Sequence, residues 1–245
     1  MYALSYVEQD AVARLYDLSR SWRADDIGAG YTQSNVDTGA VSFKLFRCPA
    51  APTSRRPAGS KATETKPNKI SLAGVVMGPM DYVIMHQLRH RFYLATNMTN
   101  PNGDDNSDLA MNNTRATAIV SITDGTSNTI LMMEDGGRMN HYQGRTDNGG
   151  TTRDEGIGWS DPDSASGSYD GVYADDNSLL PDNPVTNRTI CVMNCNNDSE
   201  PYSFHTGGMN IALADGSVRF IRDNIDRATW AALLTARAGD VAGDY

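Results

Sequence analysis

Long hydrophobic runs are missing from this sequence of 245 residues. No apolar stretch approaches the roughly 20 residues that a membrane-spanning helix needs, and no hydrophobic region of a secretory signal precedes the first expected helix. Hydrophobic residues make up only 39% of the chain and 22 positions are glycine, so we expect a modest core and long loops. We assign residues 1–245 to a single domain, because the length suits one large domain or one with long insertions.

Positive charge is also scarce. The chain has 21 Lys and Arg against 30 Asp and Glu, which gives a net charge of −9. Nucleic acid and anionic lipid surfaces both select a basic face, so we expect no nucleic-acid partner. Several of the basic residues fall in the stretch 49–70, which is rich in Pro, Ser and Thr and which we interpret as a linker-like loop.

The common enzyme signatures are absent. There is no G-x-S-x-G elbow, no phosphate-binding G-x-x-x-x-G-K-[ST] loop and no G-x-G-x-x-G after an expected strand. His86 and His90 have the spacing of helical metal ligands, but Gln87 stands where a metalloprotease carries Glu. Arg89 and Arg91 would repel a cation. We therefore expect an exposed basic helix face here, and no enzymatic activity.

The chain contains only three cysteines. This number fits an exported protein with one disulfide and one remaining thiol. Cys191 and Cys195 lie four residues apart, and we predict that they pair and stabilise a turn. A zinc site at this pair is disfavoured, because there is no second pair and His205 is the only nearby imidazole. Cys48 is expected to be buried or bonded to another chain.

The first half of the chain indicates few regular elements. Apolar residues recur at near-helical spacing over 3–18, so we expect residues 1–27 to form a helical N-terminal region. Residues 41–46 alternate and predict a short strand, whereas 82–88 fits a strand or a helix. Residues 119–122 and 129–133 are predicted to be strands around a turn at Asp124 and Gly125. Trp159 is a candidate core anchor.

Residues 203–239 give the clearest structural pattern, a β-hairpin followed by a helix. Apolar residues alternate on both sides of Asp215-Gly216, a strong hairpin signal. A two-residue turn there would place Ile211 opposite Phe220. Asp226 is the expected N-cap of a final helix that ends near Gly239 and buries Trp230, Leu233 and Leu234.

One loop has the oxygen spacing of a calcium site. Asp124, Thr126 and Asn128 offer side-chain oxygens at alternate positions, as calcium-binding loops do. The same spacing recurs in 104–108. Turn-forming side chains explain both runs without a metal, so calcium is one of two interpretations of these loops, and no other cofactor is indicated.

His205 is expected to be structural. About ten strand residues separate it from Asp215, which corresponds to roughly 30 Å at 3.3 Å per residue, so the two side chains cannot form a catalytic dyad. We expect the His205 ring to hydrogen-bond Asp223 or Asp226 and to hold the base of the hairpin against the final helix.

Several segments, in order along the chain, resemble those of a planctomycete-type family of pilin-like or pseudopilin-like proteins whose biochemical function is undefined. The closing motif of that family is a His, nine residues and Asp-Gly, matched here by His205, Asp215 and Gly216. The other matching segments are Leu4-Ser5-Tyr6-Val7-Glu8-Gln9, Phe46-Arg47-Cys48-Pro49-Ala50-Ala51-Pro52, Asp81-Tyr82, 122–129 with Glu134 and Gly136-Gly137-Arg138, and 191–205.

The resemblance implies an α+β fold: a pilin-like head in which an N-terminal helix packs on an antiparallel sheet with long loops and a C-terminal helix. In that family a prepilin cleavage site and an apolar helix precede the segment matched by residues 4–9. We expect that anchor helix to be absent from this chain. Membrane attachment is expected only through that missing helix. Related pseudopilins often carry calcium in a C-terminal loop, which supports the calcium interpretation by analogy.

The implied function is structural. The resemblance suggests the extracellular or cell-surface head of a filament subunit that assembles with copies of itself, as a homo-oligomer or filament. The alternative is a surface module that binds a glycan or solute through its Gly-, Asn- and Asp-rich loops. The environments of Trp22 and Trp159 distinguish the two functions. Aromatic side chains that converge on a cleft would favour a binding module, and their burial in the core would favour a scaffold.

Overall fold

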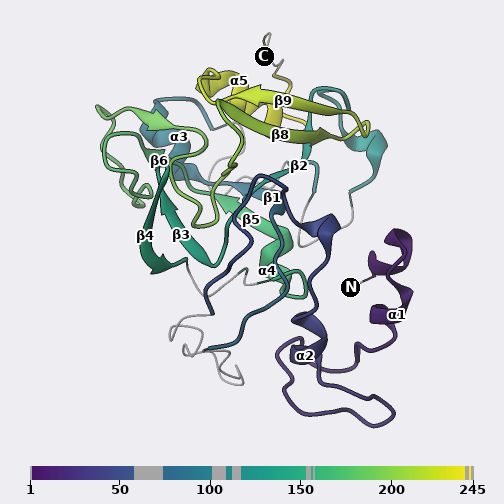
Figure 1. The fold of residues 1–245 in the computed structure, drawn as a ribbon. Coiled ribbons are helices and arrows are strands. Elements are labelled where there is room, and N and C mark those ends of the chain that lie inside the picture. The colour runs from purple at the N-terminus through teal and green to yellow at the C-terminus, as the bar shows by residue number, and fades with distance from the viewer. Residues whose placement is uncertain are drawn as a thin grey trace.

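The computed structural model describes residues 2–57, 74–100, 109–111, 117–152, 156, 158–240 and 243. Its centre is a five-stranded sheet in the order β5-β1-β2-β8-β9 (Figure 1). Neighbouring strands are antiparallel, except that β1 and β5 are parallel. The strands are β1 (Tyr82–Leu88), β2 (Ile130–Glu134), β5 (Ser166–Tyr169), β8 (Gly208–Leu213) and β9 (Val218–Arg222). This sheet together with short helices confirms the α+β class.

Smaller elements surround the sheet. Two further pairs of strands are β3 (Asn140–Gln143) with β4 (Thr146–Thr151), and β6 (Val172–Tyr173) with β7 (Ile190–Cys191). The α-helices are α1 (Asp10–Ala13), α2 (Asn35–Gly39), α3 (His90–Thr96), α4 (Pro162–Ala165) and α5 (Arg227–Leu234), and 3-10 turns form η1 (Leu4–Val7), η2 (Lys44–Phe46) and η4 (Ile119–Ser121). Within the described part of the chain, none of these helices has the length and apolar character needed to cross a bilayer.

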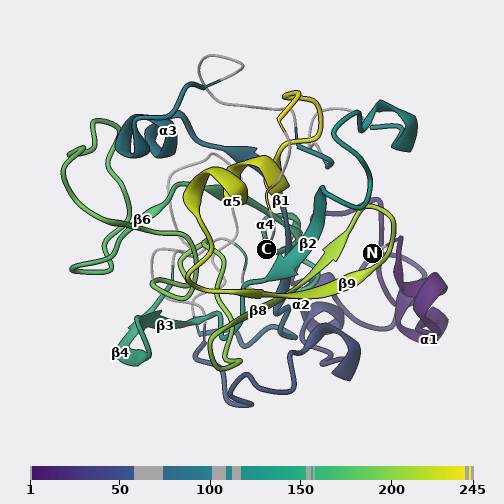
Figure 2. The ribbon, with the colours of Figure 1, turned by 90° about the horizontal axis from the view of Figure 1, so that it is seen from above.

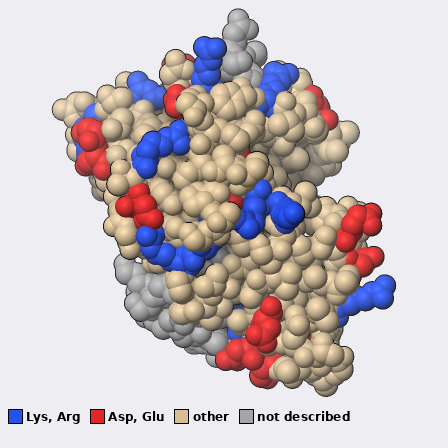
Figure 3. All heavy atoms as spheres, viewed as in Figure 1, with Lys and Arg blue, Asp and Glu red and all other residues tan. Residues whose placement is uncertain are grey.

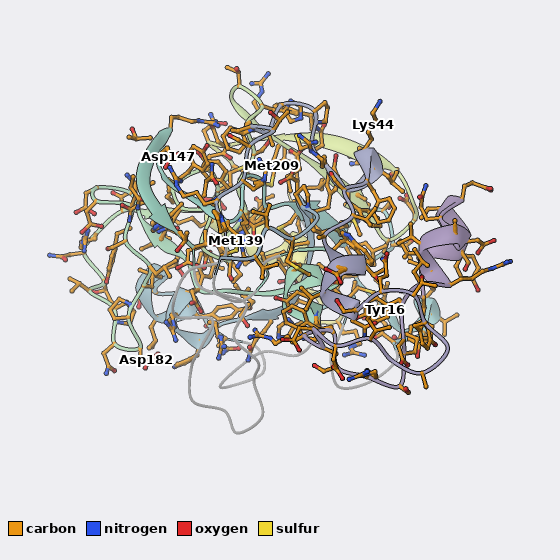
Figure 4. The ribbon with its side chains drawn as sticks, turned by 60° about the horizontal axis from the view of Figure 1, so that its bottom comes forward. Tyr16, Lys44, Met139, Asp147, Asp182 and Met209 are labelled. Atoms are coloured by element: carbon orange, nitrogen blue, oxygen red, sulfur yellow. A yellow bond between two sulfur atoms is a disulfide. The ribbon has the colours of Figure 1, made fainter. Side chains whose placement is uncertain are left out.

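The main apolar core joins the sheet to α3 and α5 (Figure 2). Trp230 of α5 is fully buried, and its ring meets Tyr169 of β5 with centroids 6.1 Å apart. The Phe92 ring of α3 also packs against the Tyr169 ring, with centroids 5.1 Å apart. Met209 of β8, labelled in Figure 4, is also fully buried. Large side chains from the sheet, α3 and α5 therefore meet in this core.

The final helix begins as the sequence predicts. The Asp226 carboxylate accepts hydrogen bonds from the N–H groups of Ala228 and Thr229, at 2.9 and 3.2 Å, which is N-capping. The predicted end near Gly239 is wrong. The helix ends at Leu234 because Thr235 takes an extended conformation and bridges to Leu109.

The predicted N-terminal helix is also wrong. Residues 3–18 form two short turns, η1 and α1, because Glu8 has a left-handed backbone with φ 60° and ends the first turn. These turns do not continue along the sheet but pack on a separate apolar cluster, and Figure 1 shows α1 at the side of the molecule, away from the sheet. The buried members of that cluster are Leu4, Tyr16, Phe43 and Trp159.

Trp159 is the centre of this second cluster, and its predicted role as a core anchor is confirmed. Its ring lies 5.2 Å from that of Phe43 and 6.5 Å from that of Tyr16, which is labelled in Figure 4. The indole N–H donates to the Val41 carbonyl at 2.7 Å. The strand predicted over 41–46 is wrong, because the apolar side chains of this segment pack into the aromatic cluster and its last three residues form the η2 turn.

The observed elements settle four other expectations. The strand predicted over 129–133 is confirmed as β2, but 119–122 contains the η4 turn instead of a strand. His86 lies within β1 and His90 begins α3, so the predicted helical spacing of these two residues is wrong. Residues 82–88 pair on both sides, and this pairing decides in favour of a strand.

The hairpin forms, but its predicted register is wrong by one residue. Leu213 and Ser217 flank a three-residue loop, and the Gly216 N–H bonds to the Leu213 carbonyl at 2.9 Å. Ile211 consequently pairs with Arg219 and not with Phe220. A shift of one residue turns every side chain of a strand to the opposite face. Ile221 is therefore buried, whereas Val218 and Phe220 are 68% and 48% exposed.

We predict that Gly216 is required for this loop. Its φ of +86° lies in the left-handed region, although a Cβ there would meet nothing within 4 Å, so a substitution is costly through the backbone alone. Gly216→Val should lower the free energy of unfolding by more than about 1 kcal/mol. Gly216→Asn, which tolerates this region, should cost less. Urea unfolding of both variants measures the difference, and equal midpoints for the valine variant and the parent would contradict the prediction.

Candidate functional site

Three side chains of metal-binding type, distant in sequence, meet beside the central sheet: Cys48, Glu134 and His205. The Cys48 Sγ lies 3.2 Å from the Glu134 Oε1 and 3.5 Å from the His205 Nε2. The His205 Nε2 lies 3.2 Å from the same Glu134 oxygen. Cys48 and Glu134 are buried, and the His205 side chain is 30% exposed. The three atoms therefore converge on one point, and of the three side chains His205 is the one that is partly exposed.

The pairing of β2 with β1 fixes the position of Glu134. It is the last residue of β2 and lies opposite Tyr82 of β1. Its second carboxylate oxygen, Oε2, accepts the main-chain N–H of Asn210 in β8 at 2.9 Å. The side chain is thus fixed from two neighbouring strands.

Asp81, the residue before β1, holds the main chain of Cys48 in position. The Cys48 N–H donates to the Asp81 Oδ2 at 3.0 Å, and the Asp81 N–H donates to the Phe46 carbonyl at 2.8 Å. Asp81 is itself fully buried and receives two hydrogen bonds from the Arg55 guanidinium, at 2.8 and 2.9 Å. Burial raises the pKa of the Asp81 carboxyl, while Arg55 and the N–H groups of Gly137 and Cys48 oppose that rise.

His205 is held through its main chain. Its N–H donates to the Ser203 hydroxyl at 3.1 Å, and its carbonyl accepts from the Arg145 guanidinium at 3.2 Å. The neighbouring Phe204 ring covers Gly137, where a Cβ would lie 2.8 Å from a ring carbon. Gly137 also has a φ of +88°. Only glycine fits this contact, so the 136–138 turn and the 203–205 segment pack tightly together.

The disulfide supports the same segment from the other side. Cys191 and Cys195 are bonded, with Cα atoms 6.4 Å apart, and Cys48 is the free cysteine. Within the disulfide loop, the Asn194 side-chain oxygen accepts the N–H of Ser203 at 2.7 Å. The loop therefore positions the residues that lead into His205.

The geometry does not form a nucleophilic relay. In a relay the carboxylate bonds one nitrogen of the imidazole ring and the nucleophile bonds the other, but here Glu134 and Cys48 both approach Nε2. Burial is the main cause that raises the pKa of the Cys48 thiol to about 11, and Glu134 adds to the rise. A protonated, buried thiol is a poor nucleophile. The arrangement suits hydrogen bonding or metal coordination.

The expected partners of His205 are wrong. The ring contacts Glu134 and Cys48 and not Asp223 or Asp226. Asp226 caps α5, and the Asp223 N–H bonds to the Gly207 carbonyl. Asp215 lies in the hairpin loop, where its carboxylate accepts from the N–H and hydroxyl of Ser217 at 2.8 and 2.7 Å. The two ends of the closing motif therefore serve separate local roles.

The loop proposed to bind calcium has its own hydrogen bonds. The two carboxylate oxygens of Asp124 accept the N–H groups of Ala238 and Gly239, at 2.8 and 3.0 Å. The Thr126 carbonyl accepts the Asp215 N–H, and Asn128 donates its N–H to the Gly125 carbonyl. A cation would compete with two amides for the oxygens of Asp124, and calcium at this loop stays a prediction. The similar run at 104–108 lies outside the described residues.

Sequence reasoning missed this cluster. Glu134 and Cys48 each fall in a segment singled out for resemblance, as do Asp81, Gly137 and His205. Those segments carry the signal, because four separated stretches with unusual polar or glycine residues converge in space. Spacing along the chain does not reveal it, since Cys48 and His205 are 157 residues apart.

We predict energetic coupling between His205 and Glu134. In metal-free protein, His205→Ala should lower the free energy of unfolding by roughly 1–3 kcal/mol, because a buried carboxylate loses a donor. The double variant with Glu134→Gln should cost less than the sum of the single variants, with a coupling of roughly 0.5–3 kcal/mol. Urea unfolding gives all four values. His141→Ala is the matched control, since that ring contacts the amides of Asn196 and Asn148, and additive costs for His205 and Glu134 would argue against the coupling.

A second prediction concerns the cysteines. A non-reduced digest should yield one peptide pair linked through Cys191 and Cys195, and Cys48 should alkylate only after the protein is unfolded. Mass spectrometry distinguishes this result from a Cys48–Cys195 link, which would require a different arrangement of the whole site. Because its loop is short, the disulfide should add only roughly 2 kcal/mol to the free energy of unfolding.

Comparisons with known proteins place the chain in a family. Neither a search of curated proteins nor a search of solved structures returned a match. The family model described as "Protein of unknown function (DUF1559)" matches residues 1–228, which is most of the chain. This protein therefore belongs to the DUF1559 family.

Proposed function

We propose that this protein is a non-enzymatic structural subunit: the extracellular head of a pilin-like or pseudopilin-like protein that assembles with copies of itself. Membership of the DUF1559 family and the resemblance of the matching segments to pilin-like proteins support the proposal. The disulfide supports a location outside the cytoplasm, because disulfides persist in oxidising compartments. Basic and acidic side chains are interspersed on the face shown in Figure 3, which is consistent with a partner other than nucleic acid.

The positions of the tryptophans favour a scaffold over a binding module. Trp159 and Trp230 are buried in two different apolar clusters, and Trp22 is partly buried against the cluster that contains Trp159. A surface hollow between β9 and the start of α5 has one aromatic side chain, Phe220, in its lining. A glycan-binding cleft would present several such rings, so the alternative has less support.

The polar cluster also suits a scaffold. The Cys48–Glu134–His205 group and the Asp81–Arg55 ion pair connect the 46–56 loop, the central strands and the segment before β8. Buried groups that satisfy one another in this way hold long loops in one arrangement. The low hydrophobic content makes such connections important, because the apolar core alone spans only part of the chain.

The observation that carries the proposal is the exposed apolar side of the N-terminal turn. Leu4 is buried and anchors η1, whereas Tyr2 and Tyr6 are 80% and 89% exposed. In pilin-like proteins the region preceding the head mediates assembly. We propose that Tyr2 and Tyr6 contribute to the contact between neighbouring subunits.

Sedimentation velocity over a range of concentrations tests this proposal. The parent protein should self-associate, and a Tyr2→Lys, Tyr6→Lys variant should associate more weakly by a factor of about ten, the loss produced by roughly 1.4 kcal/mol. Val120→Lys is the matched control, because Val120 is an apolar residue with 91% exposure in a different part of the chain, the η4 turn. A parent protein that stays monomeric would contradict self-assembly, and equal association of the double variant would contradict the N-terminal contact.

A further inference from the structure

We propose that Cys48, Glu134 and His205 form a binding site for a divalent transition metal ion of the zinc class. The site is separate from the calcium loop at 124–128 and independent of the proposed assembly role. It rests on the convergence of three different ligand types, from three separate parts of the chain, on a single point.

The distances between the three atoms match tetrahedral coordination. Zinc binds sulfur at about 2.3 Å and imidazole nitrogen or carboxylate oxygen at about 2.0–2.1 Å. Tetrahedral angles then require separations of about 3.6 Å between sulfur and either other ligand, and about 3.3 Å between nitrogen and oxygen. The observed separations are 3.5 Å for S–N, 3.2 Å for S–O and 3.2 Å for N–O. Small shifts of the thiol would admit the ion.

The chemistry of the ligands selects the class of metal. A thiolate and an imidazole favour zinc and similar transition metals, whereas calcium and magnesium prefer sets made only of oxygen ligands. Binding would displace the Cys48 thiol proton to solvent. The resulting thiolate and the Glu134 carboxylate would then balance the two charges of the ion, so a buried site would become neutral.

Each ligand is already oriented by neighbouring groups. Asn210 bonds the far oxygen of Glu134, Asp81 bonds the N–H of Cys48, and Ser203 bonds the N–H of His205. Supporting contacts of this kind fix ligand geometry and raise affinity. The partly exposed histidine supplies a path for the ion, and three protein ligands leave a fourth position for water or another small ligand.

Equilibrium dialysis of the full chain against Zn²⁺, after EDTA treatment, tests the site. The parent protein should bind one ion, and titration with Co²⁺ should give the thiolate-to-metal charge-transfer band that sulfur ligation produces. Cys48→Ser and His205→Asn should each weaken Zn²⁺ binding by at least about tenfold. Loss of a group that only supports a metal ligand already weakens binding by about tenfold to a hundredfold, and these variants change a ligand itself. The Cys48→Ser variant should also lack the band. His141→Asn is the matched control, being a histidine outside the cluster, and should bind like the parent.

Circular dichroism of each variant checks that it folds, and the parent protein provides a test that needs no variant. In partially denaturing urea, Zn²⁺ should slow alkylation of Cys48, whereas Mg²⁺ should not. Failure of the parent to bind a stoichiometric Zn²⁺ would overturn the proposal. So would unchanged affinity in folded His205→Asn, or a bound Co²⁺ that gives no thiolate band, since a cluster held only by hydrogen bonds predicts these results.

Discussion

The burial of two carboxylates, Asp81 and Glu134, constrains much of this structure. A buried charge without donors costs several kcal/mol even after relaxation, so the surrounding chain has to supply them. Arg55 and the N–H groups of Cys48 and Gly137 surround Asp81. Asn210, Cys48 and His205 meet Glu134. The two carboxylates lie close together because β1 and β2 pair through Tyr82 and Glu134, so one requirement brings the early loop, the central strands and the last hairpin to the same place.

Three elements indicated by local patterns were predicted correctly: β2, the hairpin and α5. The N-cap at Asp226 and the apolar side chains after it identify α5, and alternation identifies β2 and the hairpin. Each of these signals is contained within about ten residues, where helix and strand periods determine which side chains share a face. The α+β class was implied by the resemblance, and these local elements agree with it.

Three errors have identifiable physical causes. The N-terminal apolar spacing suits a helix, but Glu8 takes a left-handed conformation that ends the first turn. The hairpin loop contains three residues in place of two, and this change alone turns Val218 and Phe220 to solvent. The partner of His205 depends on which segment lies beside it, and Glu134 is 71 residues away (205 − 134). Backbone conformation at one residue and contacts across the fold are not encoded in periodicity.

The disulfide and the proposed metal would stabilise the same part of the molecule by different means. The bond between Cys191 and Cys195 orders the loop in which Asn194 holds Ser203, and Ser203 in turn holds His205. A metal at His205 would connect this segment to β2 and to the Cys48 loop. A ligand present at a hundred times its dissociation constant adds about 2.7 kcal/mol to folding stability, comparable with the roughly 2 kcal/mol expected from so short a disulfide loop. For a chain with a modest apolar core, these two cross-links would set how firmly the last hairpin is attached to the rest of the fold, and hence how rigid a surface the protein would offer in the proposed assembly.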